Sequence, residues 1–440
     1  MVTRREFIDK LATGAAGLAI TSSARSYGKI MGSNERLNFA VIGLNSRAYA
    51  HLSSLYANKD AACIGYVCDV ESNILSKFAA ATAKQMGTAP KTEKDFRKIF
   101  EKTDVDAITI ATPDHWHAPM AILGLQAGKH VYVEKPCSHN PAEGVMLVKA
   151  QQKYNKLVQM GTQQRSSKHT IEIVNKINDG VIGRAYYAKA WYTNGRKSIG
   201  IGKPAPVPAA LDWDLWQGPA PRQTYKDNVQ PYNWHWFHTW GTGETLNNGT
   251  HEIDVARWAL GVDYPNRITA SGGRYAYKDD WQFYDTLNTS FEYDDKVIAW
   301  ECTCCNDMRR FNGRGRGTII EGTNGTVLVD RDGYEIYDLK SKKTSEFKVG
   351  GETSTGDLVG ADSMTDAHFA NFIAGIRKGE KLNAPAVIGN IAVTMLQLSN
   401  IAWRVKRDLQ INPDNGMIRN DVEAMNGWGR DYEKGWEPKV

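Results

Sequence analysis

The chain has 440 residues, of which 42% are hydrophobic and 23% are charged, a length and mixture typical of a globular protein with two or three domains. This composition excludes a disordered, collagen-like or coiled-coil protein. The net charge is +5, but residues 1–30 carry five basic and two acidic side chains, so the other residues together carry only +2. So small a charge gives no basic surface for nucleic acid, and we expect no nucleic-acid partner.

The first thirty residues have the pattern of an export signal. Residues 3–8 read TRREFI, which resembles the twin-arginine motif Ser/Thr-Arg-Arg-x-Phe-Leu, and the run LATGAAGLAI follows. This run is too short to cross a bilayer, and small residues at 22–24 offer a cleavage region. We therefore predict a twin-arginine signal over residues 1–30, a periplasmic or exported protein, and no membrane span. An N-terminal amphipathic helix packed on the body is the alternative.

Residues 36–160 alternate strand patterns with helix patterns. The expected strands are residues 37–43, 63–70, 105–112 and 129–136, and the expected helices are residues 46–57, 74–86 and 117–128. Alternation at this spacing predicts βαβ units on a parallel sheet, whose ligands bind at the carboxyl ends of the strands. The predicted fold class is therefore α/β, beginning with a Rossmann dinucleotide-binding domain.

The turn after the first strand carries a dinucleotide-binding pattern. Gly43, Asn45 and Ala48 occupy the small-residue positions of G-x-G-x-x-G/A, with Asn45 replacing the second glycine. Asparagine tolerates positive φ better than most residues. Asp69 ends the second strand, where a carboxylate binds ribose hydroxyls and repels a 2′-phosphate. No basic residue follows it directly, so NAD is favoured over NADP; an α/β domain without a cofactor is the alternative.

A lysine follows the fourth strand, in the sequence Glu134-Lys135-Pro136. This position lies at the ligand edge of a parallel sheet, where a lysine with a lowered pKa can act as a general base or acid. A surface lysine paired with Glu134 is the simpler alternative.

These turns together resemble those of the Gfo/Idh/MocA family of NAD(P)-dependent oxidoreductases, above all through Glu134-Lys135-Pro136. The resemblance implies that Lys135 contacts both substrate and nicotinamide, and that His115 and His117 line the nicotinamide side. The expected cofactor contacts are Gly43, Asn45, Ser46, Arg47, Asp69, Thr112, Pro113, His115, His117, Glu134 and Lys135.

Residues 161–412 are expected to form an α+β substrate-binding and oligomerisation domain, followed by a tail over 413–440. The expected strands are residues 184–194, 267–277, 285–295, 296–305, 316–333 and 334–340, with helices over 171–179 and within 366–407. Their period-2 alternation predicts a large, open, mostly antiparallel sheet. The family resemblance implies that its open face packs against another subunit, which predicts a homodimer or homotetramer.

Two segments of this domain match the family's substrate cleft. Residues 161–165 match a segment that re-enters the cleft, so Gln164 and Arg165 are expected to bind substrate. Residues 247–254 match the pattern Asp-x-Gly-x-His-x-x-Asp, with Asn247 in place of the first Asp. If this segment is one helix, Asn247, His251 and Asp254 share a face.

His251 is the expected general base, because imidazole titrates near neutral pH. Asn247 is expected to assist catalysis by binding a substrate hydroxyl, and Asp254 to contact substrate. A purely structural His251 is the alternative.

Tryptophan is concentrated in one quarter of the chain. Nine of the 13 tryptophans lie between Trp191 and Trp300. Aromatic faces suit the C–H faces of sugars. We expect most of these rings to pack a long insert and one or two to reach the ligand, Trp236 among them.

Cys302, Cys304 and Cys305 lie close together, but no second cysteine pair and no nearby histidine accompany them, so we expect buried thiols and no metal site.

The patterns together predict an enzyme that transfers a hydride between a secondary hydroxyl of a sugar, glycoside or cyclitol and tightly held NAD, with Lys135 or His251 taking the hydroxyl proton. Two alternatives stay open. An NAD-dependent glycoside hydrolase on this fold would use transient oxidation at C3 to permit elimination. A non-catalytic sugar-binding protein is suggested by Asn45 and Asn247, which depart from the family patterns.

Overall fold

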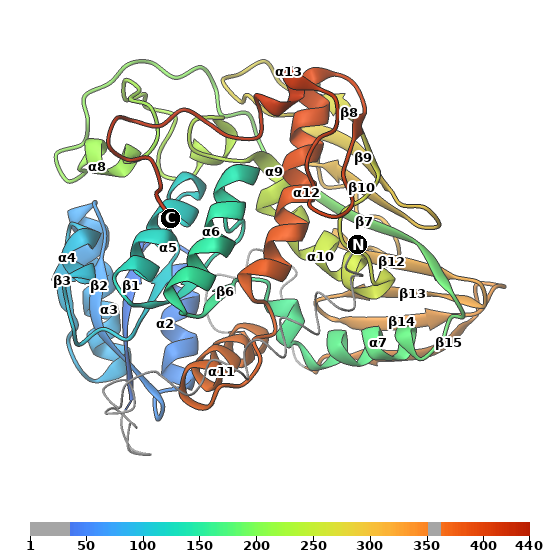
Figure 1. The fold of residues 1–440 in the computed structure, drawn as a ribbon, viewed down its shortest axis with the longest axis horizontal. Helices are drawn as coiled ribbons and strands as arrows, with labels where there is room; N and C mark the ends of the chain where they lie inside the picture. The colour runs from blue at the N-terminus through green and yellow to red at the C-terminus, as the bar shows by residue number, and fades with distance from the viewer. Residues whose placement is uncertain (1–35, 351–361) are drawn as a thin grey trace. The chain divides into compact units, whose positions relative to one another are not determined.

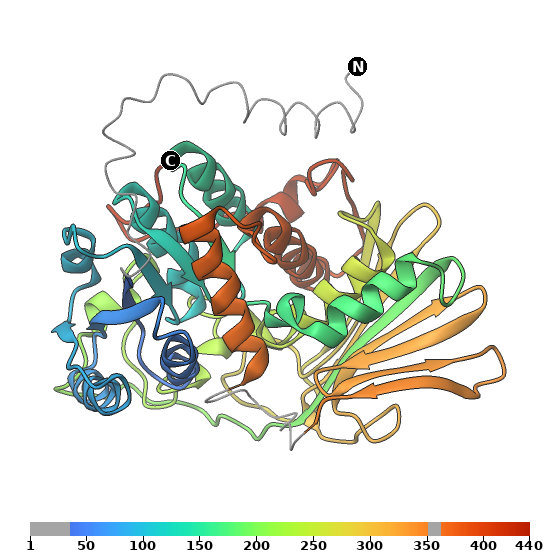
Figure 2. The ribbon, with the colours of Figure 1, turned by 90° about the horizontal axis from the view of Figure 1, so that it is seen from below.

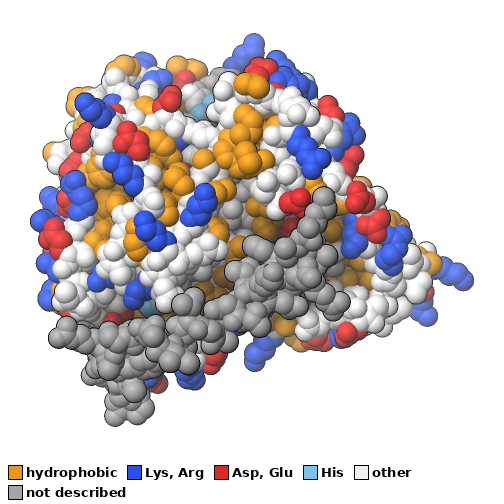
Figure 3. All heavy atoms as spheres, in the orientation of Figure 1, with side chains coloured by type: hydrophobic (Ala, Val, Ile, Leu, Met, Phe, Trp, Pro, Cys, Tyr) orange, Lys and Arg blue, Asp and Glu red, His pale blue; other side chains and the backbone are white. Residues whose placement is uncertain are grey.

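The computed structural model describes residues 36–350 and 362–440. The export signal predicted over residues 1–30 lies outside the described residues. By their internal contacts, residues Leu37–Val440 form one unit. On the face drawn in Figure 3, basic and acidic side chains are interspersed.

The first half of this unit is a Rossmann domain (Figure 1). Its parallel sheet has the strand order β3-β2-β1-β4-β5-β6. The strands are β1 (Leu37–Ile42), β2 (Ala62–Cys68), β3 (Lys91–Glu93), β4 (Ala107–Ile110), β5 (His130–Val133) and β6 (Val158–Met160). The helices are α2 (Ala48–Ala57), α3 (Ser72–Met86), α4 (Phe96–Phe100), α5 (Asp114–Gln126) and α6 (Pro141–Tyr154). All four predicted strands are present, and the parallel sheet is confirmed.

The turns predicted to carry chemistry meet at the carboxyl edge of this sheet. Ala111 N–H donates to the carbonyl of Ile42 at 2.9 Å, and Glu134 N–H donates to the carbonyl of Ile110 at 3.0 Å. Because β1, β4 and β5 are neighbours, the residues that follow them lie side by side. The edge is thereby a shared platform for residues far apart in the sequence.

The second half contains a ten-stranded sheet in the order β15-β14-β13-β12-β7-β10-β9-β8-β16, with β11 beside β7. Its strands are β7 (Ala185–Gly195), β8 (Arg267–Gly273), β9 (Thr286–Glu292), β10 (Val297–Thr303), β11 (Cys305–Asn306), β12 (Arg316–Gly322), β13 (Gly325–Asp330), β14 (Gly333–Tyr337), β15 (Lys343–Lys348) and β16 (Leu409–Gln410). The pairs are antiparallel apart from β7 and β10, which run parallel. The mostly antiparallel sheet is thus confirmed.

One face of this sheet carries the helices. Ile298, Trp300 and Cys302 alternate along β10 as buried side chains, and α10 (Gly249–Leu260) contacts β7, β10 and β12. Figure 2 shows α7 (Lys168–Asn178) lying along the same sheet. The opposite face is partly solvated, with the ion pair of Lys189 and Glu301 at 2.6 Å. Its use as a subunit interface stays a prediction.

Helix α12 (Ala386–Val405) joins the two halves by packing on α6 and on β8. Among the residues that the structure describes, it alone is long and apolar enough to cross a membrane, and 72% of its apolar window is buried inside the protein. Its apolar character therefore fits a core helix. Helix α11 (Ser363–Lys378) packs on α2.

The tryptophan-rich insert has its own small core. It contains α8 (Trp213–Gln217), the 3-10 helix η2 (Asn233–Trp236) and α9 (Gly243–Asn247). Trp213 and Trp216 stack with ring centroids 4.7 Å apart, and Trp240 meets both edge-on. Most of these rings pack the insert, as expected.

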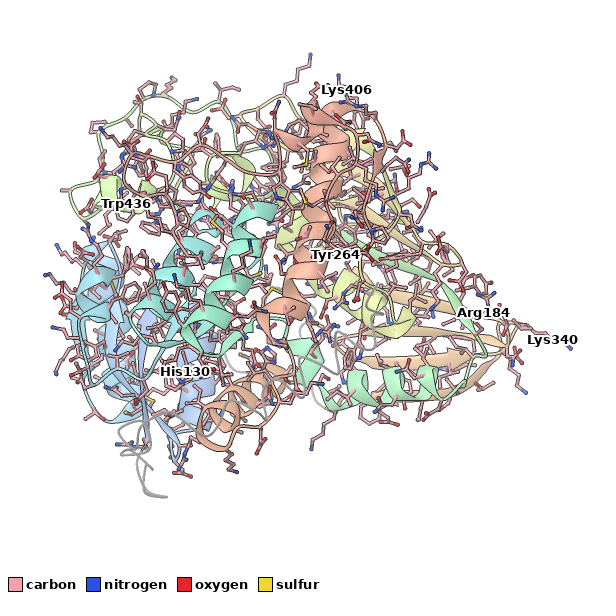
Figure 4. All side chains as sticks on the ribbon, in the orientation of Figure 1. His130, Arg184, Tyr264, Lys340, Lys406 and Trp436 are labelled. Carbon is pink, nitrogen blue, oxygen red and sulfur yellow. The ribbon has the colours of Figure 1, made fainter. Side chains whose placement is uncertain are left out.

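The C-terminal tail returns to the Rossmann domain. After α13 (Val422–Met425), Arg430 forms an ion pair with Glu143 of α6 at 2.6 Å. Trp436, labelled in Figure 4, packs edge-on against Trp116 of α5 with centroids 5.2 Å apart. The six cysteines are all thiols, as predicted.

Candidate active site

A cavity of about 560 Å³ lies against the carboxyl edge of the Rossmann sheet and is also lined by the insert and by α9 and α10. This volume suits a small-molecule ligand. The predicted site residues that line it are Gly43, Asn45, Ser46, Arg47, Asp69, Thr112, Pro113, His117, Glu134, Lys135, Asn247 and His251. The fold thus brings twelve of the predicted site residues together at one cavity.

Gly43 lets β1 turn sharply at this cavity. Its φ is +80°, and a Cβ at this position would lie 2.7 Å from the carbonyl carbon of Ala111 and from the nitrogen of Thr112. Only glycine fits this backbone without a shift. The turn thus has the close backbone approach that a dinucleotide-binding turn needs.

The second half of the turn differs from the prediction. The positive φ falls on Ser46, at 39°, and not on Asn45. Asn45 Oδ1 instead accepts a hydrogen bond from the Ser46 N–H at 3.0 Å, which replaces the conformational freedom of a glycine with a side-chain bond. Helix α2 then begins without a side-chain cap, and the N–H groups of Ala48 and Tyr49 donate to the backbone carbonyls of Asn45 and Ser46 at 3.2 and 3.1 Å.

Asp69 is held in place by the turn itself. Its carboxylate accepts the Leu44 N–H at 2.7 Å and the Glu71 N–H at 2.9 Å. Burial raises the pKa of Asp69 to about 6, although these N–H bonds oppose the shift. A carboxylate at this point fits the ribose of a dinucleotide, and together with Gly43 it shows that the residues present suit NAD.

Glu134 is a structural anion beside the cavity. It accepts a hydrogen bond from Arg47 Nε at 2.8 Å, and His51 Nε2 lies 2.9 Å from the same oxygen. Burial opposes the ionisation of Glu134, but Arg47 and His51 outweigh it and hold the pKa of Glu134 well below its usual range. The alternative pairing of Glu134 with Lys135 is not what the structure shows.

Lys135 reaches across the cavity to the second domain. Its Nζ donates to the backbone carbonyl of Asn247 and, at 3.2 Å, to Asn247 Oδ1. Asn247 Nδ2 in turn donates to the hydroxyl of Tyr232 at 3.2 Å. Asn247 therefore orients the lysine and does not act on His251.

His251 presents a buried imidazole to the same cavity. Its Nδ1 has no hydrogen-bond partner in the described parts of the chain. Burial, together with the positive charges of Arg331 and Lys135, lowers the pKa of His251 well below its usual value. The ring is consequently neutral at neutral pH and able to accept a proton.

The two histidines of α5 have different environments. His117 lines the cavity, but its ring nitrogens lie 2.6 Å from the carbonyl of Pro136 and 2.8 Å from that of Thr112, so backbone groups fix the ring. His115, expected to contact the cofactor, does not line the cavity. His115 is fully buried outside the lining, with Nε2 3.0 Å from the carbonyl of Trp216, and burial lowers its pKa to about 3.

Arg165 and Asp254, expected to contact substrate, do not line the cavity either. Arg165 donates to the Asp254 carboxylate at 2.6 and 2.8 Å, and both side chains are buried away from the cavity. The helix is interrupted at Asn248, between α9 and α10, so Asn247 and Asp254 do not share one helix face. Gln164 is likewise buried outside the lining, and its neighbour Gln163 lines the cavity instead.

Trp236 does not reach the ligand cavity either. It is 1% exposed and stacks on Trp281 with centroids 3.9 Å apart. Trp216 and Trp234 line the cavity in its place. Two tryptophan rings of the insert thus line the cavity, in number as expected, but Trp236 is not one of them.

Sequence reasoning also missed several polar lining residues, among them Tyr232, Gln163 and Arg331. Gln163 lay inside the motif that drew attention to Gln164, so the motif was an available signal. Arg331 follows β13 in a turn, and nothing in its local sequence distinguishes it. Over residues 36–350 and 362–440, no cluster of His, Cys, Asp and Glu is arranged to hold a metal ion.

Comparison with known families agrees with this site. The family model described as "Oxidoreductase family, NAD-binding Rossmann fold" matches residues 37–162, and the model of the GFO/IDH/MocA C-terminal domain matches residues 171–328. The chain belongs to the Gfo/Idh/MocA family. The resemblance seen in the sequence is thereby confirmed, and NAD is the cofactor that its Rossmann domain binds.

Individual members of the Gfo/Idh/MocA family are distant. A glycosyl hydrolase family 109 protein of Shewanella sp. (strain W3-18-1) is 26% identical over 155 residues, which are 34% of each chain. The chain thus spans about a third of that relative's length.

Solved structures share the fold over more of the chain. The WlbA dehydrogenase of Bordetella pertussis, in complex with NADH and UDP-GlcNAcA, is 18% identical with a TM-score of 0.64, covering 86% of this chain and 99% of that one. A levoglucosan dehydrogenase, in complex with NADH and levoglucosan, is 18% identical with a TM-score of 0.65 and the same coverage.

Proposed function

We propose that this protein is an NAD-dependent oxidoreductase that oxidises a secondary hydroxyl of a sugar, glycoside or cyclitol. The observation that carries the proposal is the meeting of Lys135 and His251 in one cavity with the dinucleotide turn at Gly43. The sugar ligands of the WlbA and levoglucosan dehydrogenase structures support the substrate class.

The Rossmann half holds the cofactor in this proposal. The Gly43 turn would hold its pyrophosphate, and Asp69 its ribose. When bound, NAD supplies the hydride acceptor.

The two remaining groups divide the proton chemistry. Lys135 donates to two oxygens of Asn247 and so carries the ammonium charge that stabilises a developing alkoxide. The neutral His251 lines the same cavity and accepts the hydroxyl proton. Asn247 is a positioning residue, because it fixes Lys135 from the opposite wall.

A second reaction is favoured by one observation, the similarity to glycosyl hydrolase family 109 proteins. In that reading the same hydride transfer oxidises C3 of a glycoside transiently. The acidified C2–H then loses its proton, the aglycone leaves, water adds and the ketone is reduced again. The net reaction releases aglycone and leaves NAD unchanged.

One experiment separates these reactions. The purified full-length protein is incubated with NAD and a panel of sugars, cyclitols and aryl glycosides, while nicotinamide reduction and aglycone release are followed together. Reduction without cleavage is the expected result. Aglycone release without net reduction would replace the dehydrogenase with the glycosidase, and neither signal would overturn both.

The matched variants are K135A and K340A. Lys340 is exposed at the far tip of the second sheet (Figure 4). We expect K135A to lose about 1,000-fold in hydride transfer with NADH binding nearly intact, and K340A to behave as wild type. Full activity of K135A would remove the lysine from the mechanism.

A further inference from the structure

Arg331 is a buried cation in the wall of the active-site cavity. It follows β13 in the turn that leads to β14, and it is 6% exposed. It lines the same cavity as His251 and Lys135. The guanidinium thus comes from the second sheet, whereas the residues that fit the dinucleotide come from the Rossmann sheet.

Within the described residues, no hydrogen bond or ion pair satisfies the Arg331 guanidinium. The carboxylates near it have other partners. Both oxygens of Glu252 accept from Arg316, at 2.8 and 3.0 Å. Both oxygens of Asp362 accept from the N–H and hydroxyl of Thr365.

Other buried arginines have carboxylate partners of a kind that the Arg331 guanidinium lacks. Arg165 and Arg316 are as deeply buried, and each forms a two-point contact with a carboxylate. Arg257 also has carboxylate neighbours, at 3.1 Å from Asp263 and 3.6 Å from Asp254. An unpaired guanidinium loses its hydration on burial and gains nothing in return. The pattern points to a partner that arrives with the ligand.

The positive charge of Arg331 affects the pKa of His251, the proposed base. After burial, Arg331 is the strongest influence that lowers the pKa of His251. Burial and the neighbouring Arg316 also lower the pKa of Arg331 itself, to about 9. An anion bound at Arg331 would relieve both effects, so the group that satisfies the guanidinium would also make His251 a better proton acceptor.

We propose that Arg331 binds a carboxylate of the substrate, so that the preferred substrate is a sugar acid, either a uronate or an aldonate. A planar guanidinium offers two parallel N–H groups that match a carboxylate, and one positive charge matches one negative charge. A neutral sugar would leave Arg331 unpaired. This inference rests on the proposed oxidoreductase function, because it identifies the substrate of the same site.

The test compares matched sugar pairs on the full-length protein with NAD. Glucose is paired with glucuronate, a methyl glucoside with its methyl glucuronide, and glucose 6-phosphate is added as a dianion of similar shape. The variants are R331Q and R184Q. Arg184 is the control because it is largely exposed at the far end of the second sheet (Figure 4).

For the wild type we expect kcat/KM for the acid to exceed that for its neutral partner by at least about 100-fold. R331Q should lose about 100-fold for the acid but not for the neutral sugar, whose turnover should stay the same or rise because the pKa of His251 rises. R184Q should match the wild type, and the Kd of NADH should be unchanged in both variants. Preference for a neutral sugar or the phosphate ester would overturn the proposal, as would weaker NADH binding as the main effect of R331Q.

Equilibrium binding keeps this test separate from the proposed function. If no sugar reduces the cofactor, calorimetric titration of the NAD-loaded protein with glucuronate and gluconate still measures the site. Binding that is lost in R331Q but kept in R184Q supports the carboxylate site even when the oxidoreductase proposal fails. Equal acid binding by wild type and R331Q would overturn the carboxylate site alone.

Discussion

Two glycines with positive φ allow the free-energy cost of backbone strain to be distinguished from the cost of a steric clash at the cofactor turn. Gly43 and Gly87 have φ values of +80° and +75°, but a Cβ at Gly87 would meet nothing within 4 Å. We expect G87A to cost about 1 kcal/mol of unfolding free energy through strain alone. G43A should cost about 3 kcal/mol, because its Cβ also meets the backbone of Ala111 and Thr112.

Urea unfolding measures the unfolding free energies of G43A and G87A, and NADH fluorescence titration measures how well each variant binds the cofactor. G43A should lose NADH binding while G87A keeps it. Equal unfolding free energies for the two variants would contradict the close packing of the turn.

Asp69 gives the cofactor site a pH dependence. Its pKa is raised to about 6, chiefly by burial. Ionised Asp69 accepts hydrogen bonds from the ribose, so binding favours the ionised form. The Kd of NAD should therefore rise as pH falls through about 6, and D69N should remove this dependence. A wild-type titration that is flat from pH 7 to pH 5 would argue against ribose binding by Asp69.

The same residue should set the preference between the two dinucleotides. Removing the carboxylate in D69A should weaken NAD by about 30-fold while NADP, no longer repelled, weakens less or tightens. The ratio of the two Kd values is the measurement. An unchanged ratio would assign the NAD preference to another residue.

At the scale of elements, the sequence predicted what depends on local patterns. Buried apolar runs such as FAVI before Gly43 identified the Rossmann strands, because central parallel strands are apolar on both faces. Strand β3, with the sequence KTE, was missed because it is short, polar and largely exposed. The prediction of one face for Asn247 and Asp254 failed because the break at Asn248 is invisible to a spacing rule.

Contacts between distant segments were beyond such rules. In η2, Trp234 lines the cavity whereas Trp236 turns into the core. The stacking of Trp281 on Trp236 distinguishes the buried ring from the ring that lines the cavity. Arg165 and Asp254 are 89 residues apart in the chain, so their pairing needed the folded structure.

That ion pair joins the 3-10 helix η1 (Gln163–Ser166) to α10 and should act on stability. R165M would leave Asp254 buried with only Arg257 nearby, at 3.6 Å. We expect a loss of about 3 kcal/mol in unfolding free energy, with most of it recovered in the double variant R165M/D254L. Urea unfolding tests this. A raised KM with unchanged stability would instead restore Arg165 to substrate binding.

For the whole molecule, the cavity depends on segments that are far apart in sequence. The Rossmann turns, the insert, α9, α10 and the turn carrying Arg331 each contribute to its wall. The tryptophan excess is explained mainly by the insert's own core, and only secondarily by a ligand. The cavity therefore depends on the contacts that hold these segments in place. The C-terminal tail makes some of these contacts.

The C-terminal tail contacts the Rossmann domain through Arg430. Arg430 donates to the carbonyl of His115 at 2.7 Å and pairs with the fully buried Glu143 at 2.6 Å. R430M leaves Glu143 uncompensated, so we expect a loss of about 3 kcal/mol in unfolding free energy. NADH binding should weaken a few-fold as well, because α5 carries cavity residues such as Trp116. The exposed Arg419 of the same tail supplies the control, and R419M should change stability by less than about 0.5 kcal/mol. Wild-type stability in R430M would mean that the tail contributes nothing to the fold, whereas recovery in R430M/E143Q would confirm that the buried carboxylate causes the loss.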